Sequence, residues 1–195
     1  MGVYLVSVAA DEWFGEEDGW AELATPLNHE LRQRGLPPYD SGSEATAVVH
    51  GSGQAFEEKL TYPMDGFEAL CRRHLSEEDV ETFCGWTVLV PFSLDEVIRL
   101  PVGSAYTESS TMVAGAPQVE ATAERLARAI ELPGETPSPR ENLDLTAWFR
   151  DGPAQELAAA RPGPWSEDLG AAFYVALFLR AAQHSVRRGC PLTYI

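Results

Sequence analysis

The sequence predicts an α+β fold, in which one domain combines a mixed, mostly antiparallel sheet of about four to six strands with about six helices. Short β-branched apolar runs, which are typical of buried strands, occur beside longer segments with helical periodicity. The two kinds of segment do not alternate regularly, as they would in a parallel βαβ protein. The length of 195 residues and the hydrophobic fraction of 45% suit a single domain, spanning 1–195, with its own core.

The N-terminal part of the chain predicts two strands with a helical region between them. The apolar runs at 3–8 and 45–50 fit strands. Apolar side chains between the two runs recur at helical spacing: Trp20, Leu23, Leu27 and Leu31. Thr25 and Pro26 resemble an N-cap and a first helical position, so either one helix starts there or two short helices meet there.

The middle of the chain predicts short helices followed by the best candidate for a central strand. A helical segment carrying Phe56 and Leu60 is expected first, and a second helix follows over 64–71. Ser76 is the expected N-cap of a third helix, because acidic residues follow it in the first turn. The continuous apolar run at 86–92 predicts a strand buried on both faces.

Strands and a helix are expected to alternate irregularly after that run. Segments 97–102 and 111–114 fit strands, and Pro117 fits the start of a helix. The proline-rich stretch 133–142 predicts a surface loop or linker. Apolar and polar residues alternate over 143–150, which predicts a half-buried strand.

The clearest element is a C-terminal helix over 166–188. Ser166 is the expected N-cap, and Gly189 is the expected stop. The helix is apolar almost all round over 169–179, which predicts a central position in the core. Residues 192–195 are expected to add a short edge strand.

The net charge excludes partners more firmly than any motif does. The chain holds 30 acidic and 14 basic residues, a formal net charge of −16, and 21 of the acids but only 6 of the bases lie in residues 1–120. Such a polyanion is repelled by phosphate backbones and by anionic membrane surfaces, so we expect neither nucleic acid nor membrane as a partner. A cationic protein or peptide is the partner that this charge permits.

The cysteine content and the N-terminus indicate a protein of the cytoplasm, and the choice of basic residues indicates a bacterial source. The three cysteines show no CxxC spacing and are expected to be reduced thiols. The N-terminal segment lacks the basic region of a signal peptide. The basic residues comprise 13 arginines and one lysine, a bias typical of a GC-rich bacterial genome.

The densest run of charge supports the leading hypothesis, an acidic interaction domain that binds a cationic protein or peptide. Five carboxylates and two aromatic side chains occur together: Asp11, Glu12, Trp13, Phe14, Glu16, Glu17 and Asp18. Exposed aromatic residues beside charge are typical interface anchors, although both rings could instead fold back onto the core and leave a solvated loop. The spacing does not match a calcium-binding EF-hand loop.

A glycine-rich turn supports the alternative hypothesis, a small-molecule binding protein or a small hydrolase or transferase. The turn consists of His50, Gly51, Ser52 and Gly53 and lies between a predicted strand and a predicted helix. Backbone N–H groups in that position can bind an anion, but the turn matches neither a P-loop nor a GxSxG nucleophile elbow. An ordinary tight turn is the simpler interpretation. The hydroxyl-rich segment 104–111 could line the same pocket or form a β-turn.

No catalytic pair, metal site or cofactor site stands out. Cys71 and His74 lie one helical turn apart and could supply two zinc ligands, but the register favours a buried Cys71. We therefore expect no metal and no cofactor. Nucleophilic catalysis would require some of the following residues to converge: Ser52, His50, His74, His184, Cys71 and Cys84.

Overall fold

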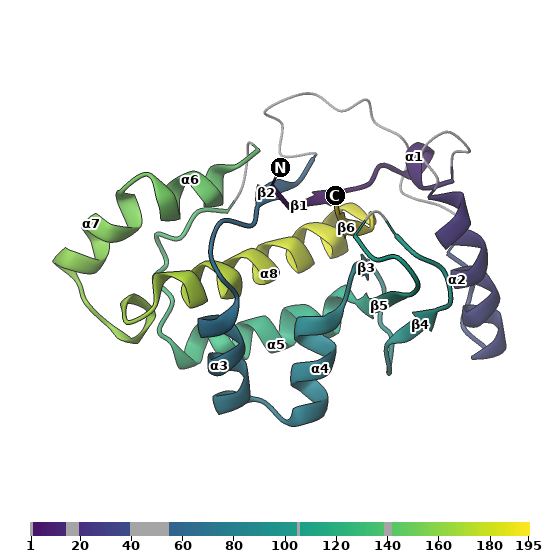
Figure 1. The fold of residues 1–195 in the computed structure, drawn as a ribbon, viewed down its shortest axis with the longest axis horizontal. Coiled ribbons are helices and arrows are strands. Elements are labelled where there is room, and N and C mark those ends of the chain that lie inside the picture. Colours follow the sequence, from purple (N-terminus) through teal and green to yellow (C-terminus); the bar gives the residue numbers. More distant parts are fainter. Residues whose placement is uncertain (1, 15–19, 40–54, 105, 139–141) are drawn as a thin grey trace.

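A six-stranded mixed sheet organises the chain. The computed structural model describes residues 2–14, 20–39, 55–104, 106–138 and 142–195 (Figure 1). Within these residues the strand order is β2-β1-β6-β3-β5-β4. The strands are β1 (Tyr4–Ser7), β2 (Glu57–Lys59), β3 (Val88–Val90), β4 (Ile98–Leu100), β5 (Thr111–Gly115) and β6 (Leu192–Tyr194). Only β3 and β5 pair in parallel, and the other neighbours are antiparallel.

Eight α-helices and one short 3-10 helix complete the described part of the chain. They are α1 (Ala10–Phe14), α2 (Ala21–Gln33), α3 (Asp65–His74), α4 (Glu77–Gly85), α5 (Ala116–Ala129), α6 (Asp144–Arg150), α7 (Pro153–Ala160), η1 (Pro164–Ser166) and α8 (Leu169–Arg188). The prediction of an α+β fold with a mixed, mostly antiparallel sheet is confirmed.

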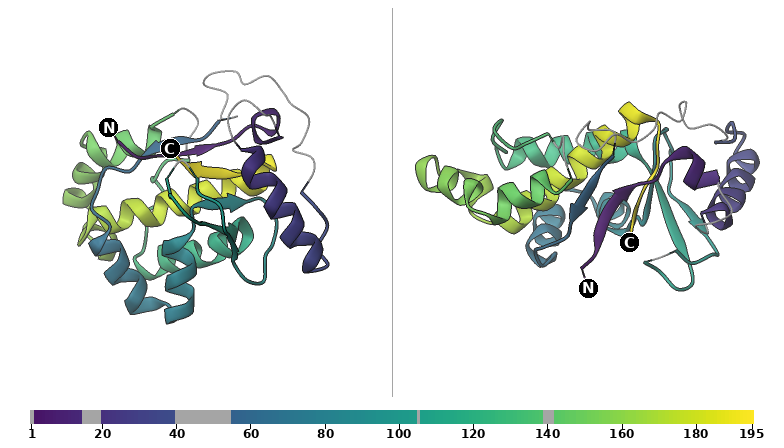
Figure 2. Two further views of the ribbon diagram at one scale, coloured as in Figure 1. Left: turned by 45° about the vertical axis from the view of Figure 1, so that its right-hand side comes forward. Right: turned by 90° about the horizontal axis from the view of Figure 1, so that it is seen from above.

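Helices cover both faces of the β3–β5 half of the sheet. Successive residues of a strand point to opposite faces. Val88 and Val113 accordingly pack with α2, whereas Leu89 and Ala114 belong to a larger cluster with α3, α5 and α8. Figure 2 shows α2 on one side of the sheet and α8 on the other.

The C-terminal helix is central, as predicted, but it begins later than expected. α8 packs against α5 and α3, and every side chain from Ala171 to Leu179 is buried. Its N-cap is Asp168, whose carboxylate accepts a 2.9 Å hydrogen bond from the Ala171 N–H. The predicted cap, Ser166, lies instead in η1, where its hydroxyl hydrogen-bonds to Gly163. Gly189 ends the helix with a φ of 64°.

The last strand lies in the middle of the sheet, so the prediction of an edge strand was wrong. Thr193 pairs with Val6 of β1 on one side and with Val88 of β3 on the other. All three residues of β6 are buried. Only residues 189–191 separate the end of α8 from the start of β6.

Two predictions for the N-terminal half of the chain were also wrong. The chain around Phe56 is not helical, because residues 57–59 form β2 against β1. α2 runs without a break through Pro26, so neither alternative for its start holds. Burial of Leu23, Leu27 and Leu31 on the sheet outweighs the backbone hydrogen bond that the proline removes.

Segment 143–150 is a helix, α6, rather than a half-buried strand. The fully buried Glu58 carboxylate accepts hydrogen bonds from the backbone N–H groups of Leu145, at 2.9 Å, and Thr146, at 2.8 Å. An anionic acceptor at a helix N-terminus favours the helix, and this acceptor comes from a distant strand. The predicted strand at 45–50 lies outside the described residues.

Candidate functional site: an acidic groove

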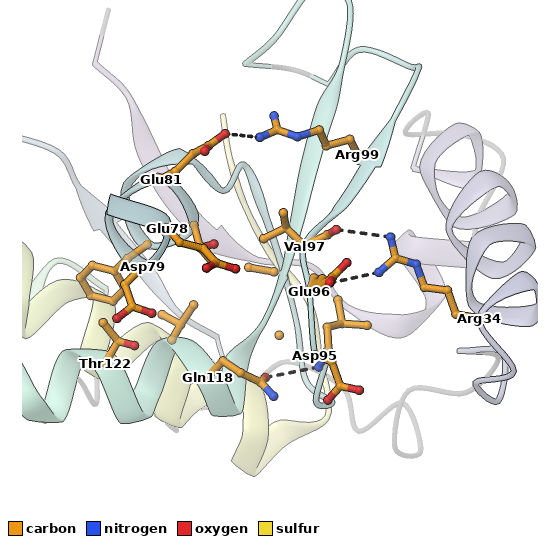
Figure 3. Close-up of a pocket in the computed structure, with 16 residues that line it drawn as sticks. Arg34, Glu78, Asp79, Glu81, Asp95, Glu96, Val97, Arg99, Gln118 and Thr122 are labelled. Atoms are coloured by element: carbon orange, nitrogen blue, oxygen red, sulfur yellow. Dashed lines mark hydrogen bonds and ion pairs between the residues drawn. The ribbon is translucent and has the colours of Figure 1, made fainter. Parts of the chain in front are cut away.

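A groove with a volume of about 560 Å³ lies between α4, the loop that joins β3 to β4, and the start of α5 (Figure 3). We call it the acidic groove, because five carboxylates and only two guanidinium groups line it. These charged residues are Glu78, Asp79, Glu81, Asp95, Glu96, Arg34 and Arg99. Polar neutral side chains, including Thr82, Gln118 and Thr122, complete the lining.

One wall of the acidic groove is built by α4. The Ser76 hydroxyl accepts a 3.1 Å hydrogen bond from the Asp79 N–H, which confirms the predicted N-cap. Phe83 anchors the helix in the core, with ring centroids 5.8 Å from Phe67 and 5.5 Å from Phe178. Because one face of α4 is buried in this way, Glu78 and Glu81 remain on its exposed face.

The opposite wall is the β3–β4 loop, which a close backbone contact fixes beside α5. Gly115 ends β5, and a Cβ atom on it would lie only 2.7 Å from the Leu94 nitrogen and 2.8 Å from the Phe92 oxygen. The Gln118 side chain accepts a 3.3 Å hydrogen bond from the same Leu94 N–H. Glycine is therefore needed at this position, and the loop presents Asp95 and Glu96 to the groove (Figure 3).

The groove lies where the parallel strands β3 and β5 end. The register Val90↔Gly115 brings their carboxyl ends together, and α5 begins directly after Gly115. In open α/β sheets, crevices at the carboxyl ends of parallel strands are frequent ligand sites. This placement is therefore a second reason, besides charge, to regard the groove as a binding site.

Two of the five carboxylates are already neutralised by arginine. Asp79 pairs with Arg125 at 2.9 Å, and Glu81 pairs with Arg99. The hydrogen bond from Arg125 is the main reason why the pKa of Asp79 lies below its usual value. These pairs are solvent-exposed, so they hold the side chains in place more than they stabilise the fold.

The other three carboxylates give the groove its charge. Glu78, Asp95 and Glu96 are exposed, and none of them has an ion-pair partner among the described residues. Arg34 approaches this wall but donates to the backbone oxygens of Glu96, at 3.3 Å, and Val97, at 3.4 Å. The three carboxylates are thus available for a cationic ligand.

The predicted acidic-aromatic surface is only partly described. Glu16, Glu17 and Asp18 lie outside the described residues, whereas Asp11 and Glu12 lie in α1. Trp13 is only 1% exposed, because it folds back onto the core and stacks on Trp20 with ring centroids 6.1 Å apart.

Phe14 is the more exposed of the two aromatic residues. It is 37% exposed and contacts Tyr39 with ring centroids 5.7 Å apart. Glu12 is exposed and accepts a hydrogen bond from the Ala9 N–H. Trp13 therefore contributes to packing, and Phe14 and Glu12 remain as exposed side chains of this surface.

The predicted glycine-rich site, His50, Gly51, Ser52 and Gly53, lies outside the described residues. In the hydroxyl-rich segment 104–111, which joins β4 to β5, the described residues form a turn. The backbones of Ser104 and Thr107 exchange hydrogen bonds of 2.8 and 3.3 Å, and their hydroxyls lie 2.9 Å apart.

The described histidines and cysteines do not converge in one cleft. Cys71 is buried, as expected from its register, whereas His74 is exposed at the end of α3. His184 is buried in α8 against Phe56, with ring centroids 5.5 Å apart. In the part of the chain that the structure describes, no group of three or more histidine, cysteine, aspartate or glutamate side chains is placed to hold a metal ion.

Sequence reasoning missed the acidic groove. Its carboxylates come from two segments on either side of the predicted strand at 86–92, and each segment alone is an ordinary exposed acidic stretch. The available signal was that acidic pairs flank a buried strand on both sides. Without the β3–β5 pairing, nothing in the sequence places the two segments opposite each other.

Comparison with known proteins adds no functional information. No protein family, curated protein or solved structure matches this chain. None of the helices in the described ranges combines the length and apolarity needed to cross a bilayer. The geometry and charge of the described residues are therefore the only functional indications.

Proposed function

We propose that this protein is a non-enzymatic binding domain that holds a cationic segment of a protein or peptide in the acidic groove. The observation that carries the proposal is the set of three exposed carboxylates without ion-pair partners: Glu78, Asp95 and Glu96. They lie on two facing walls, so one lysine or arginine side chain between them can contact carboxylates on both sides.

The charge of the whole chain supports the same kind of partner. A net charge of −16 attracts cationic proteins over long distances and accelerates their association. A small acidic inhibitor that masks a basic toxin or nuclease would have this charge distribution. As part of the same proposal we place the protein in a bacterial cytoplasm, because its three cysteines are free thiols and its basic residues comprise 13 arginines and one lysine.

The proposal is tested with a fluorescent octa-arginine peptide, whose anisotropy reports binding to the purified protein. The test variant carries Glu78→Gln, Asp95→Asn and Glu96→Gln. We expect this variant to bind at least tenfold more weakly, which corresponds to about 1.4 kcal/mol. Binding by the unmodified protein should also weaken as salt shortens the Debye length to about 8 Å at 0.15 M.

A matched control variant distinguishes binding in the groove from a general effect of net charge on peptide binding. Glu22→Gln, Glu77→Gln and Glu156→Gln remove the same number of charges from exposed positions in the first turns of helices, and none of these residues lines the groove. The control variant should bind nearly as tightly as the unmodified protein. Equal losses in both variants would show that the peptide responds only to net charge, and the groove would lose its role.

A second candidate function, binding of a small cationic molecule, follows from the position of the groove at the ends of β3 and β5. A thermal-shift screen of small amines and guanidines distinguishes the two functions. A ligand present at one hundred times its Kd stabilises the protein by about 2.7 kcal/mol and raises the melting temperature. If octa-arginine binds and no small cation shifts the melt, the peptide-binding function is retained.

A further inference from the structure

A second pocket, at the β2 edge of the sheet, has the opposite charge to the acidic groove. It has a volume of about 430 Å³, and the charged residues among its described lining are Lys59, which ends β2, and Arg150, which ends α6. The lining is completed by Gly2, Leu60, Thr61 and Tyr62. We call it the basic pocket. In a chain with 30 acidic and 14 basic residues, a pocket lined only by positive charges runs against the overall composition.

Both cations of the basic pocket lack a carboxylate partner in the part of the chain that the structure describes. The ion pairs found there involve neither Lys59 nor Arg150. The Lys59 ammonium lies 5.7 Å from the centre of the Tyr4 ring. Its side chain crosses Gly2 so closely that a Cβ atom on Gly2 would lie 2.5 Å from the Lys59 Cε. Both positive charges are therefore available to an anion.

Lys59 is not needed to protect the edge of the sheet. A lysine on an edge strand often prevents strands of different molecules from pairing. However, α6 already packs against β2 (Figure 1). The Lys59 N–H donates a 3.1 Å hydrogen bond to the Thr146 hydroxyl, and the Glu57 oxygen accepts a 2.8 Å hydrogen bond from the Leu143 N–H. The outer backbone groups of β2 are thus occupied, and the Lys59 side chain is left for another role.

One hydroxyl of the basic pocket also lacks a partner. The Thr61 side chain lines the pocket, and its buried Oγ1 atom has no hydrogen-bond partner among the described residues. An unsatisfied buried hydroxyl costs free energy, and rotation of the side chain would let it donate to a ligand oxygen. The Tyr62 hydroxyl, in contrast, donates a 2.9 Å hydrogen bond to the Phe149 oxygen, which holds the Tyr62 ring beside the end of α6.

We propose that the basic pocket binds the phosphate group of a small phosphate monoester or of free phosphate. A phosphate monoester carries a charge of about −1.5 to −2 at pH 7, which matches the two cations. A guanidinium group can bind two phosphate oxygens with parallel hydrogen bonds, and an ammonium group acts as a point charge. Leu60 and Tyr62 offer apolar surface to the organic part of a monoester. The proposal goes beyond the binding function of the acidic groove and does not depend on it.

The charge of the whole chain restricts the ligand to a small anion. A net charge of −16 repels extended polyanions such as nucleic acids, because most of their phosphates would lie outside the pocket. At 0.15 M salt the Debye length is only about 8 Å. A single phosphate group inside the pocket therefore responds mainly to Lys59 and Arg150.

Calorimetric titration of the purified full chain with phenyl phosphate, at physiological salt, tests the proposal. We expect saturable binding of one molecule per chain. A variant with Lys59→Gln and Arg150→Gln should bind at least about tenfold more weakly, because both cations that contact the phosphate are lost. Benzoate, which has the same ring but a single negative charge, should bind more weakly than phenyl phosphate.

A matched control variant carries Arg32→Gln and Arg128→Gln. These arginines are exposed in the last turns of α2 and α5, and neither lines the basic pocket. The control loses the same two positive charges and should bind phenyl phosphate as tightly as the unmodified protein. Circular dichroism establishes that each variant is folded. Equal losses of affinity in the two variants would overturn the proposal.

Inorganic phosphate, titrated in parallel, distinguishes the two sources of the phosphate group. Tighter binding of phenyl phosphate identifies a monoester as the ligand, because its ring contacts Leu60 and Tyr62. Equal affinities identify free phosphate. If neither compound binds saturably at concentrations up to about 10 mM, the basic pocket is not a phosphate site and the proposal is wrong.

Discussion

His184 is a titratable side chain in the apolar interior. It lies on α8, is 2% exposed, and its Nε2 atom has no hydrogen-bond partner among the described residues. Burial, with smaller contributions from Arg187 and Arg188, lowers the pKa of His184 from 6.5 to about 4. The folded protein therefore holds this imidazole in its neutral form across a range in which the unfolded chain would protonate it.

The protein should consequently lose stability as the pH falls below 6.5. The contribution of His184 is fully present above the unfolded pKa of 6.5 and is lost as the pH falls toward the folded value of about 4. We expect the free energy of unfolding to fall by roughly 2 kcal/mol between pH 8 and pH 5 from this residue alone. Urea unfolding at a series of pH values measures the change.

The control for this prediction is His184→Leu, which keeps an apolar side chain beside Phe56 and removes the titration. The difference in pH dependence between the two proteins isolates the histidine, because all other titratable groups are shared. Parallel curves for the two proteins would contradict the prediction.

Between elements, one hydroxyl joins α6 to the edge strand β2. The Thr146 Oγ1 donates a 2.7 Å hydrogen bond to the Glu58 carboxylate and accepts a 3.1 Å hydrogen bond from the Lys59 N–H. Burial raises the pKa of Glu58, and the hydrogen bonds from Thr146 and Leu145 oppose that rise. The start of α6 and the edge of the sheet thus satisfy each other's polar groups.

Replacing Thr146 with valine should destabilise the protein by about 1–3 kcal/mol, because the variant keeps the shape but leaves the Lys59 N–H unsatisfied and removes one of the three hydrogen bonds to the buried Glu58 carboxylate. Thr146→Ser retains the hydroxyl and should cost less, chiefly for the lost methyl group. Chemical denaturation of the three proteins measures the difference. Equal losses for valine and serine would mean that packing, rather than hydrogen bonding, governs this position.

The sequence predicted the elements that local patterns determine, and it did not predict the two elements that this contact joins. Strands β1, β3, β4 and β5 and helices α3, α4, α5 and α8 follow from local apolar runs, caps and periodicity, and they were predicted. β2 and α6 were not, since β2 is a polar strand of three residues and α6 is stabilised by a carboxylate 87 residues away. Local patterns carry no information about such a partner.

At the scale of the whole molecule, acidic side chains far outnumber basic ones. The formal net charge of −16 includes the three groove carboxylates that lack ion-pair partners. The sequence predicted this charge and its concentration in residues 1–120, but it could not place Glu78 and Asp95 on facing walls. Repulsion among these groups opposes the compact state.

Moderate salt should therefore raise the melting temperature. Raising sodium chloride from about 0.01 M to about 0.15 M shortens the Debye length from about 30 Å to about 8 Å and screens the repulsion. We expect an increase of a few degrees in calorimetry, and a smaller one in a variant with Glu22→Gln, Glu77→Gln and Glu156→Gln. A flat or falling melting temperature would show that repulsion is negligible.

The central position of β6 has a consequence for the synthesis of the protein. In the described part of the chain, β6 alone connects the β2–β1 pair to the β3–β5–β4 group, so these two parts of the sheet stay separate until residues 192–194 are available. The sheet can therefore close only after residues 192–194 have left the ribosome. During translation the nascent chain exposes two unpaired strand edges, β1 and β3, which are the kind of surface that molecular chaperones shield.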